Sequence, residues 1–265
     1  SLILLLLLIS YVTPTLHPDY LWHISLLGIF FPLILALNIL FSIYWIISWK
    51  KYFWANLIII LLGNTHINNI IANQKNKLDN ESFNEIQKNK EHQFDQLINI
   101  MTFNVRLLNQ NQNIKDNNIE NDIIDFIKEK KPNILCVQEY NKSNKSNELF
   151  KFYNSTNETD NKLQILTKYN VINYGYIESK NSCIYKDIIL NDTIRVYNIH
   201  LQNNWVKTMK ASYQKRANES IIIKEHINQS PYPVIICGDF NDTPISYTYS
   251  KIKKGLLDAL DESGI

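Results

Sequence analysis

The sequence has few cysteines and no internal repeats. Its three cysteines, Cys136, Cys183 and Cys237, are widely spaced, and no two of them form a CxxC pair. An odd number at such spacing argues against a disulfide framework and against a zinc site. Cys136 and Cys237 each lie in a short apolar run. We therefore expect both to be small apolar residues inside buried strands.

An excess of charge of either sign is also missing. The formal net charge is +2 over 265 residues. A nucleic-acid-binding protein usually has a strongly basic balance, so charge alone gives no argument for such a partner. The length suffices for one globular domain with additional segments. The chain starts with Ser rather than Met, and we expect the true N-terminus to lie upstream.

Charge is almost absent from the first 49 residues. Residues 24–49 form a run of 26 positions without a charge, longer than the roughly 20 apolar residues that a bilayer core requires. Trp45 and Trp49 near the end of this run suit an interfacial aromatic belt. Lys50 and Lys51 then end it. We predict a single membrane-spanning helix here, independent of the domain that follows.

Two neighbouring segments give weaker membrane signals. Residues 2–12 are nearly all Leu and Ile but too few to span alone. We interpret them as a transmembrane helix that lacks its start, the alternative being the core of a signal peptide. Residues 52–71 predict a third span, and the alternative is an interfacial or partly buried helix. Because the predicted spans carry no charge, a transporter or channel is disfavoured.

Lysines next to the predicted spans indicate an orientation. The loop at 13–23 has no Lys or Arg, whereas Lys50 and Lys51 follow the second span. The positive-inside rule places that second loop inside and, with three spans, the downstream domain outside. Four lysines between residues 75 and 90 favour the opposite orientation. We predict a multi-pass protein of a bacterial inner membrane, with an extracytoplasmic domain slightly favoured.

The pattern changes after residue 72. Residues 73–96 are polar and rich in charge, which predicts a linker or a short solvated helix. From residue 97 strands and helices alternate, which indicates layered α/β packing. We therefore divide the chain into a membrane region at 1–72, a linker at 73–96 and an α/β domain at 97–265. The predicted strands are 97–105, 134–137, 163–167, 183–189, 193–199 and 233–237, the predicted helices are 119–130 and 207–227, and 141–160 is a predicted loop.

Polar residues directly follow four of these apolar strands. Loops at strand ends often build functional sites. Taken singly, each motif is an ordinary edge or turn sequence, so their order and combination carry the prediction. The motifs are Asn104-Val105-Arg106, Gln138-Glu139, Asn198-Ile199-His200-Leu201-Gln202 and Gly238-Asp239-Phe240-Asn241.

In this order the motifs resemble those of the endonuclease/exonuclease/phosphatase superfamily, over about residues 97–261. The Gly-Asp-Phe-Asn run is the most specific part, and the segment 255–259 is similar to the family's helix-then-Asp stretch. The multi-span start resembles that of membrane-anchored bacterial members. The resemblance implies a four-layer α/β/β/α sandwich, in which two mixed sheets pack face to face between outer helices. It places the active site at one edge of the sheets.

The resemblance also implies a metal site. It makes Glu139 the main ligand of Mg²⁺, for which Mn²⁺ could substitute, and lets Asn104 support the metal or its waters. Mg²⁺ prefers oxygen ligands and often binds through only one or two carboxylates together with substrate phosphate. Arg106, beside Asn104 in the sequence, matches a position that contacts phosphate in some relatives.

Three further residues receive catalytic roles by the same resemblance. Asp239 orients and activates the attacking water, and Asn241 donates a hydrogen bond to the phosphoryl oxygen. His200 assists at the phosphate or the leaving group, a task that suits a side chain titrating near neutrality. We expect these residues to converge with Asn104 and Glu139 in one cleft.

The family pattern has two further motifs, a late Asp and a terminal Ser-Asp-His, that do not occur before Ile265. We therefore expect a C-terminally incomplete domain, from either a fragment or a truncated protein, and little activity in this 265-residue form. The predicted function is hydrolysis of a phosphate ester, namely nucleic acid, lipid or inositol phosphate, at a lipid bilayer. The alternative is a catalytically inactive, membrane-anchored binding module of the same fold.

Overall fold

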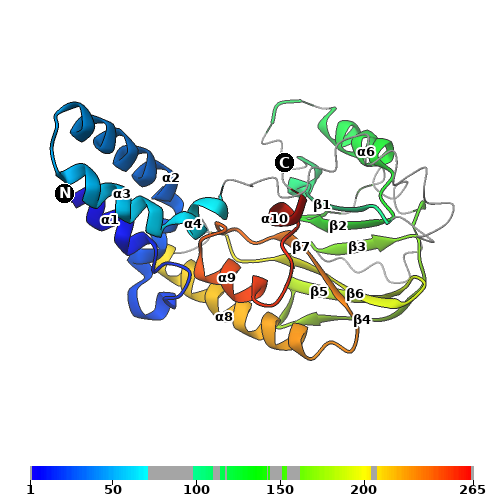
Figure 1. The fold of residues 1–265 in the computed structure, drawn as a ribbon. Coiled ribbons are helices and arrows are strands. Elements are labelled where there is room, and N and C mark those ends of the chain that lie inside the picture. The colour runs from blue at the N-terminus through cyan, green and yellow to red at the C-terminus, as the bar shows by residue number, and fades with distance from the viewer. Residues whose placement is uncertain are drawn as a thin grey trace, which may run out of the picture. The chain divides into compact units, whose positions relative to one another are not determined.

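The structure is a computed structural model, shown in Figure 1. It describes residues 2–70, 98–109, 114–116, 118–141, 143, 151–153, 162–203 and 208–263. The chain divides into two compact units, here called the helical unit and the sheet unit. The helical unit comprises Ser1–Asn89, Asn203–Ile221 and Asp242–Ile265, and the sheet unit comprises Lys90–Gln202 and Ile222–Asn241.

The helical unit is dominated by one long apolar helix. This helix, α2, runs over Pro18–Ile47 and begins at His17, whose ring accepts a hydrogen bond from the Asp19 amide. In the described part of the chain, α2 alone is long and apolar enough to cross a bilayer, judged by length and composition. The other helices described in this unit are α1 (Leu2–Ser10), α3 (Tyr52–Leu62), α4 (Asn64–Asn68), α9 (Tyr247–Lys253) and α10 (Ala259–Ser263), together with the part of α8 (Met209–Asn228) up to Ile221.

The segment predicted as a third span forms two short helices. The 11 residues of α3 extend over about 16 Å, well short of a bilayer core. Gly63 separates α3 from α4. A Cβ atom at Gly63 would lie 2.2 Å from the Tyr11 hydroxyl, so the chain has a glycine where this ring packs. A multi-pass arrangement stays a prediction from the sequence.

The long helix shares a core with a distant part of the chain. Ile245 is fully buried and clusters with Leu7 of α1 and with Phe31 and Ile34 of α2. Burial of these side chains contributes roughly 1.5–3 kcal/mol each. The prediction that this helix is independent of the downstream sequence is therefore wrong for the segment that follows Asn241, since that segment packs against it.

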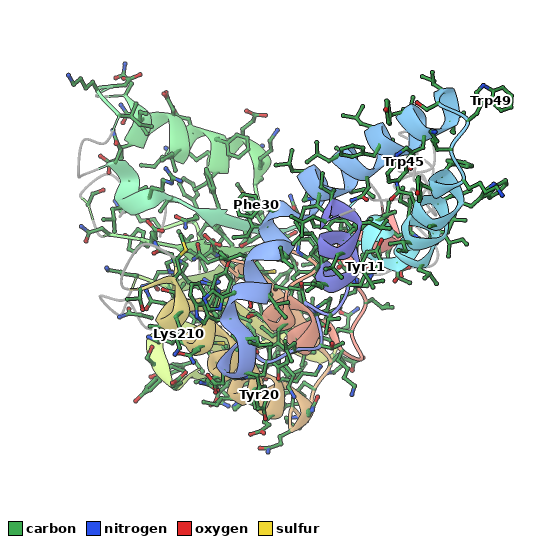
Figure 2. The ribbon with its side chains drawn as sticks, turned by 90° about the vertical axis from the view of Figure 1, so that its left-hand side faces the viewer. Tyr11, Tyr20, Phe30, Trp45, Trp49 and Lys210 are labelled. Carbon is green, nitrogen blue, oxygen red and sulfur yellow. The ribbon has the colours of Figure 1, made fainter. Side chains whose placement is uncertain are left out.

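Much of the remaining surface of α2 is apolar and exposed. Phe30, in the middle of the helix, is 52% exposed, and Trp49, just beyond its end, is 94% exposed. Figure 2 shows Trp45 and Trp49 at one end of the helix and Tyr20 at the other. Aromatic side chains thus lie at both ends of the apolar stretch, where interfacial belts form in membrane proteins.

The sheet unit contains two mixed sheets. The first sheet has the order β1 (Ile100–Asn104), β2 (Ile134–Gln138) and β3 (Gln164–Thr167), with β1 and β2 parallel and β3 antiparallel. The second has the order β4 (Val171–Ile177), β5 (Ser179–Ile189), β6 (Thr193–His200) and β7 (Val234–Asp239), in which only β6 and β7 are parallel. A short turn, η1 (Arg106–Asn109), follows β1.

The two sheets pack face to face between helices. One apolar cluster joins Ile134 and Ile165 of the first sheet to Ile188 and Val196 of the second. A second cluster packs α6 (Ile119–Lys130) on the outer face of the first sheet. The C-terminal part of α8 (Met209–Asn228) lies on the outer face of the second, where Tyr197 Oη and His226 Nδ1 are 2.9 Å apart. The predicted four-layer α/β/β/α fold is confirmed.

Most predicted strands and both helices occur near the expected positions, but the prediction omitted β4. This strand contains Asn173 and Gly175, residue types that are unfavourable in strands. A Cβ at Gly175 would lie 2.8 Å from the Tyr185 ring, so a larger residue there would force this ring to shift. The predicted linker at 73–96 and most of the predicted loop at 141–160 lie outside the described residues.

The cysteines occupy the expected kind of environment. Cys136 is fully buried and Cys237 packs partly buried against the same cluster between the sheets. A hydrogen bond with Cys237, together with burial, raises the pKa of the Cys136 thiol. Both cysteines are therefore part of the apolar core, as predicted.

Candidate active site

The inner faces of four strands change from apolar to polar towards their carboxyl ends. Alternate residues of a strand point to the same face. The apolar members belong to the cluster between the sheets. Read from the amino end, the inner positions are Ile100, Thr102 and Asn104 in β1, Ile134, Cys136 and Gln138 in β2, Ile194, Val196, Asn198 and His200 in β6, and Ile235, Cys237 and Asp239 in β7.

The strand register brings these polar ends together within each sheet. Asn104 lies opposite Gln138 in the parallel pair of β1 and β2. His200 lies opposite Asp239 in the parallel pair of β6 and β7. Because parallel strands end at the same edge of a sheet, residues far apart in the sequence meet there.

Asn104 connects the polar ends of the two sheets. Its Nδ2 donates to Glu139 Oε1 and to Asp239 Oδ2, each at 3.0 Å. Its Oδ1 accepts a hydrogen bond from the Arg106 amide at 3.1 Å, which fixes which end of the side chain faces the carboxylates. A single amide group therefore holds the two carboxylates next to each other, although 100 residues separate them in the chain.

The loop after β7 holds Asp239 and Asn241 in a fixed arrangement. The Asn241 amide donates to Asp239 Oδ1 at 2.9 Å, so both oxygens of this carboxylate accept hydrogen bonds. The Asn241 side chain donates through Nδ2 to the Leu201 carbonyl at 2.9 Å. One N–H of Nδ2 is thereby engaged with the backbone, and the second remains for another acceptor.

His200 lies beside Glu139. Its Nε2 is 3.6 Å from Glu139 Oε1, and the two side chains are 16% and 30% exposed. This nitrogen is buried and makes no hydrogen bond within the described part of the chain. A buried polar atom of this kind usually has a partner, which suggests that His200 faces a group absent from the protein itself.

Three of the predicted site residues have left-handed backbone conformations. The φ angle is 45° at Arg106, 49° at Glu139 and 49° at Asn241. Such conformations are uncommon outside glycine, and strain of this type is concentrated at functional sites. Arg106 reaches the site through its amide, and its side chain is exposed. The structure thus brings together Asn104, Glu139, His200, Asp239 and Asn241, with Arg106 adjoining them through the backbone.

The family model described as Endonuclease/Exonuclease/phosphatase family matches residues 101–263, more than half of the chain. The chain belongs to this family. Its members are hydrolases that act on phosphate esters. A second model, described as a domain of unknown function (DUF8431), matches residues 1–70. The search of curated proteins gives no match.

Solved structures similar to this chain include a toxin, a sphingomyelinase and a phosphatase. A beta toxin variant from Staphylococcus aureus with bound magnesium ions is 16% identical, with 61% of this chain and 70% of that chain covered and a TM-score of 0.46. Sphingomyelinase C from Streptomyces griseocarneus is 13% identical, with 59% and 68% covered and a TM-score of 0.46. ANGEL2, a 2′,3′-cyclic phosphatase, is 18% identical, with 60% and 56% covered and a TM-score of 0.45.

The family motifs include residues beyond those predicted from the sequence as site residues. Gln138 and Asn198 precede Glu139 and His200, and both point between the sheets. Asp242, directly after the Gly-Asp-Phe-Asn motif, pairs with Arg216 at 3.2 Å within the helical unit. The sequence signal for all of these is a polar or charged residue that interrupts or adjoins an apolar run. Such a signal indicates burial with a partner but does not identify the partner.

Proposed function

We propose that this protein is a membrane-anchored phosphoesterase that depends on Mg²⁺. The observation that carries the proposal is the contact of Asn104 with Glu139 and Asp239, since it joins carboxylates from the two sheets at their polar edge. Two acidic side chains held by one amide, with the buried Nε2 of His200 beside them, form a group suited to a cation and a phosphate oxygen.

The chemistry of these donors fits Mg²⁺ better than a metal that needs many protein ligands. Among the described residues no three His, Cys, Asp or Glu side chains, Glu139, His200 and Asp239 included, are placed so that they could hold a metal ion by themselves. Mg²⁺ keeps several waters and binds through one or two carboxylates and substrate phosphate. We propose that Glu139 holds the metal, with Mn²⁺ able to replace Mg²⁺. When bound, the metal would neutralise charge on the phosphoryl and leaving oxygens.

In the proposed site Asn104 acts by donating hydrogen bonds to the carboxylates of Glu139 and Asp239. Because its Oδ1 accepts from the Arg106 amide, its nitrogen faces Glu139 and Asp239. This arrangement orients the Glu139 carboxylate, a role that hydrogen-bonded neighbours of metal ligands commonly have. The role expected for Asn104, support of the metal site, is thus exerted through its N–H groups.

Asp239 is the proposed water-activating residue. Each of its oxygens accepts one hydrogen bond from the protein, and the remaining lone pairs can accept a proton from water. Asn241 keeps one free N–H of Nδ2 for a phosphoryl oxygen, where a positioned donor stabilises developing charge. His200 Nε2 would donate to the phosphate or the leaving oxygen, as its buried and unengaged position allows.

The anchoring part of the proposal concerns α2. Its 30 residues have the length of a bilayer span, and its exposed apolar side chains favour burial in lipid. A membrane location brings the site close to lipid phosphodiesters, and it equally suits an enzyme that cleaves nucleic acid or inositol phosphates beside a membrane. The proposal is therefore tested on substrates of all three classes.

The experiment measures turnover by the full-length protein in detergent. The substrates are bis(4-nitrophenyl) phosphate, DNA, RNA, sphingomyelin and an inositol polyphosphate, each with Mg²⁺ and with a chelator. We expect Mg²⁺-dependent hydrolysis of at least one of them. Asp239→Asn should lower kcat by about 10²–10⁴-fold, the usual contribution of a positioned acid–base group. Glu139→Gln should raise the Mg²⁺ concentration needed for activity.

Two acidic residues of the second sheet's turns, away from the site, serve as matched controls. Glu178 is exposed and also has a positive φ, 59°, so Glu178→Gln tests for an effect of charge and backbone type alone. Asp192 lies at the opposite end of β6 from His200, and Asp192→Asn should leave turnover unchanged. A full-length protein that binds Mg²⁺ but hydrolyses none of the substrates would favour the inactive binding module.

A further inference from the structure

Two fully buried amide side chains lie between the sheets, below the proposed catalytic residues. Gln138 of β2 is 1% exposed and Asn198 of β6 is 0% exposed. Gln138 Nε2 donates to Asn198 Oδ1 at 2.7 Å and also to Thr102 Oγ1 at 3.0 Å. The pair therefore joins the first sheet to the second through a direct side-chain hydrogen bond.

Asn198 makes two further contacts across the same space. Its Nδ2 donates to the carbonyls of Val137 at 2.9 Å and of Gln164 at 2.8 Å. Val137 and Gln164 are partners in the register of β2 and β3. Asn198 thus uses both N–H groups and its oxygen, and one side chain of the second sheet is bonded to two strands of the first.

Such a network permits only one spacing of the sheets. An apolar contact tolerates small shifts, whereas a buried amide that loses its partner costs about 1–3 kcal/mol. Every polar atom that Asn198 presents has a partner in this arrangement, so sliding or separating the sheets would leave several buried groups unsatisfied at once.

The network lies directly beneath the proposed metal site. Gln138 precedes Glu139 in the chain, and Asn198 lies two residues before His200 on the same inner face of β6. His200 is itself opposite Asp239 in the register. The relative position of Glu139, from the first sheet, and Asp239, from the second, therefore depends on the separation that Gln138 and Asn198 maintain.

We propose that Gln138 and Asn198 are positioning residues for the divalent-cation site. They hold the two sheets at the spacing at which Asn104 can bond Glu139 and Asp239 simultaneously. The inference rests on the proposed function only in assigning Glu139 and Asp239 to the metal site. It adds that affinity for the cation depends on two residues that touch neither metal nor substrate.

The experiment is a Mn²⁺ titration of the full-length protein, without substrate, followed by electron paramagnetic resonance. Asn198→Leu and Gln138→Met replace each amide with an apolar side chain of similar size. Each should weaken Mn²⁺ binding at least about tenfold, the effect typical of residues that orient metal ligands. Kinetics on the best substrate should show a fall in kcat at saturating Mn²⁺ with a smaller change in KM. If Asn198→Leu does not fold, Gln138→Met still tests the proposal.

The control is Val196→Ala, which creates a cavity on the same strand and the same inner face. It should lower the melting temperature while leaving the Mn²⁺ dissociation constant within about twofold, since it removes apolar atoms and leaves the hydrogen bonds of Gln138 and Asn198 in place. The proposal is overturned if Asn198→Leu and Gln138→Met bind Mn²⁺ normally, or if Val196→Ala weakens binding as much at an equal loss of stability. A wild-type protein that binds Mn²⁺ without hydrolysing any phosphate ester would contradict the proposed function and leave this test intact.

Discussion

Gly238 shows why the Gly-Asp-Phe-Asn motif begins with glycine. Its φ is 141°, and a Cβ atom would lie 2.0 Å from the Ile199 carbonyl oxygen and 2.6 Å from the Ile199 nitrogen. These are backbone atoms of the neighbouring strand β6, so they cannot move aside without breaking the pairing with β7. The motif's glycine therefore allows β6 and β7 to approach, which places His200 beside Asp239.

We predict that Gly238→Ala destabilises the protein by on the order of 3 kcal/mol or more, because strain and overlap with backbone act together. Gly255→Ala is the matched control, since Gly255 also has a positive φ, 75°, but no atom lies within 4 Å of its added Cβ. That variant should cost only about 1–2 kcal/mol. Thermal unfolding of both variants checks the prediction, and equal losses would contradict the role given to the Ile199 backbone.

At the residue scale the sequence predicted which polar residues lie together at the edge of the sheets but not how they are bonded. Polar residues after apolar strands identified Asn104, Glu139, His200 and Asp239, because strand ends meet at one edge. The sequence could not show that Asn104 presents its nitrogen, since that depends on the Arg106 amide. The left-handed conformation of Glu139 was equally invisible, because glutamate has no preference for that region and nothing in its residue type signals it.

At the scale of elements, α8 contacts the second sheet through a side chain that titrates, His226. Tyr197 Oη lies 2.9 Å from His226 Nδ1, and the His226 ring lies 4.9 Å from the Tyr185 ring. Burial, together with the nearby Arg195, lowers the pKa of His226, and Asp187 acts in the opposite direction. The folded protein therefore keeps this histidine neutral at a pH where the unfolded chain would protonate it.

We predict that His226 makes the protein less stable as the pH falls below about 6.5, the ordinary pKa of histidine. In that range the unfolded state binds a proton that the folded state does not, so stability decreases with decreasing pH. Melting temperatures at about pH 8 and pH 5.5 should differ less in His226→Gln than in the wild type. An identical pH dependence in the two proteins would rule out this contribution.

A buried ion pair links α8 to the segment after Asn241, within the helical unit. Arg216 and Asp242 are 0% and 4% exposed, and their closest atoms are 3.2 Å apart. Burial raises the pKa of Asp242 and Arg216 opposes the shift. We predict that Arg216→Met costs about 3–5 kcal/mol, because it leaves a buried charge unpaired. Denaturant unfolding should show that adding Asp242→Leu to this variant restores most of the loss, and no restoration would contradict the pairing.

The elements themselves were predicted well where their patterns were strong. The fully buried strand β2 and the amphipathic helix α6 appear near their expected positions. The strand β4 was omitted because Asn173 and Gly175 have low strand propensity, and only the Tyr185 ring explains the glycine. The division of residues 52–68 at Gly63 was equally hidden, since it depends on a contact with Tyr11 that is distant in sequence.

At the scale of the whole molecule, α2 combines a lipid-compatible surface with a contact to the C-terminal segment. Phe30, Leu33 and Leu40 are each more than half exposed, while Phe31 and Ile34 pack on Ile245. Apolar length indicated the helix correctly, but no sequence pattern identified Ile245 as its partner. The helix therefore has one face that packs on the protein and one exposed apolar face, which would contact lipid in the proposed anchoring.

We predict that the full-length protein stays with membranes after an alkaline carbonate wash. Leu33→Asp combined with Leu40→Asp should release it, because a charge near the centre of a span costs about 2.5–3.5 kcal/mol on insertion scales. The control is Tyr52→Asp, at the start of α3 and outside the long span. Fractionation of wild type and variants checks this, and a wild-type protein found in the wash supernatant would contradict membrane anchoring.

The most direct measurement is the position of Mn²⁺ in crystals of the full-length protein, from anomalous diffraction. The account predicts a peak at the polar edge of the two sheets, next to the Glu139 carboxylate and close to Asp239, and its loss in Glu139→Gln crystals grown in the same conditions. A structure with no Mn²⁺ at this edge, or with Mn²⁺ bound only elsewhere while hydrolysis proceeds, would contradict the claim that these residues form a metal-dependent phosphoesterase site.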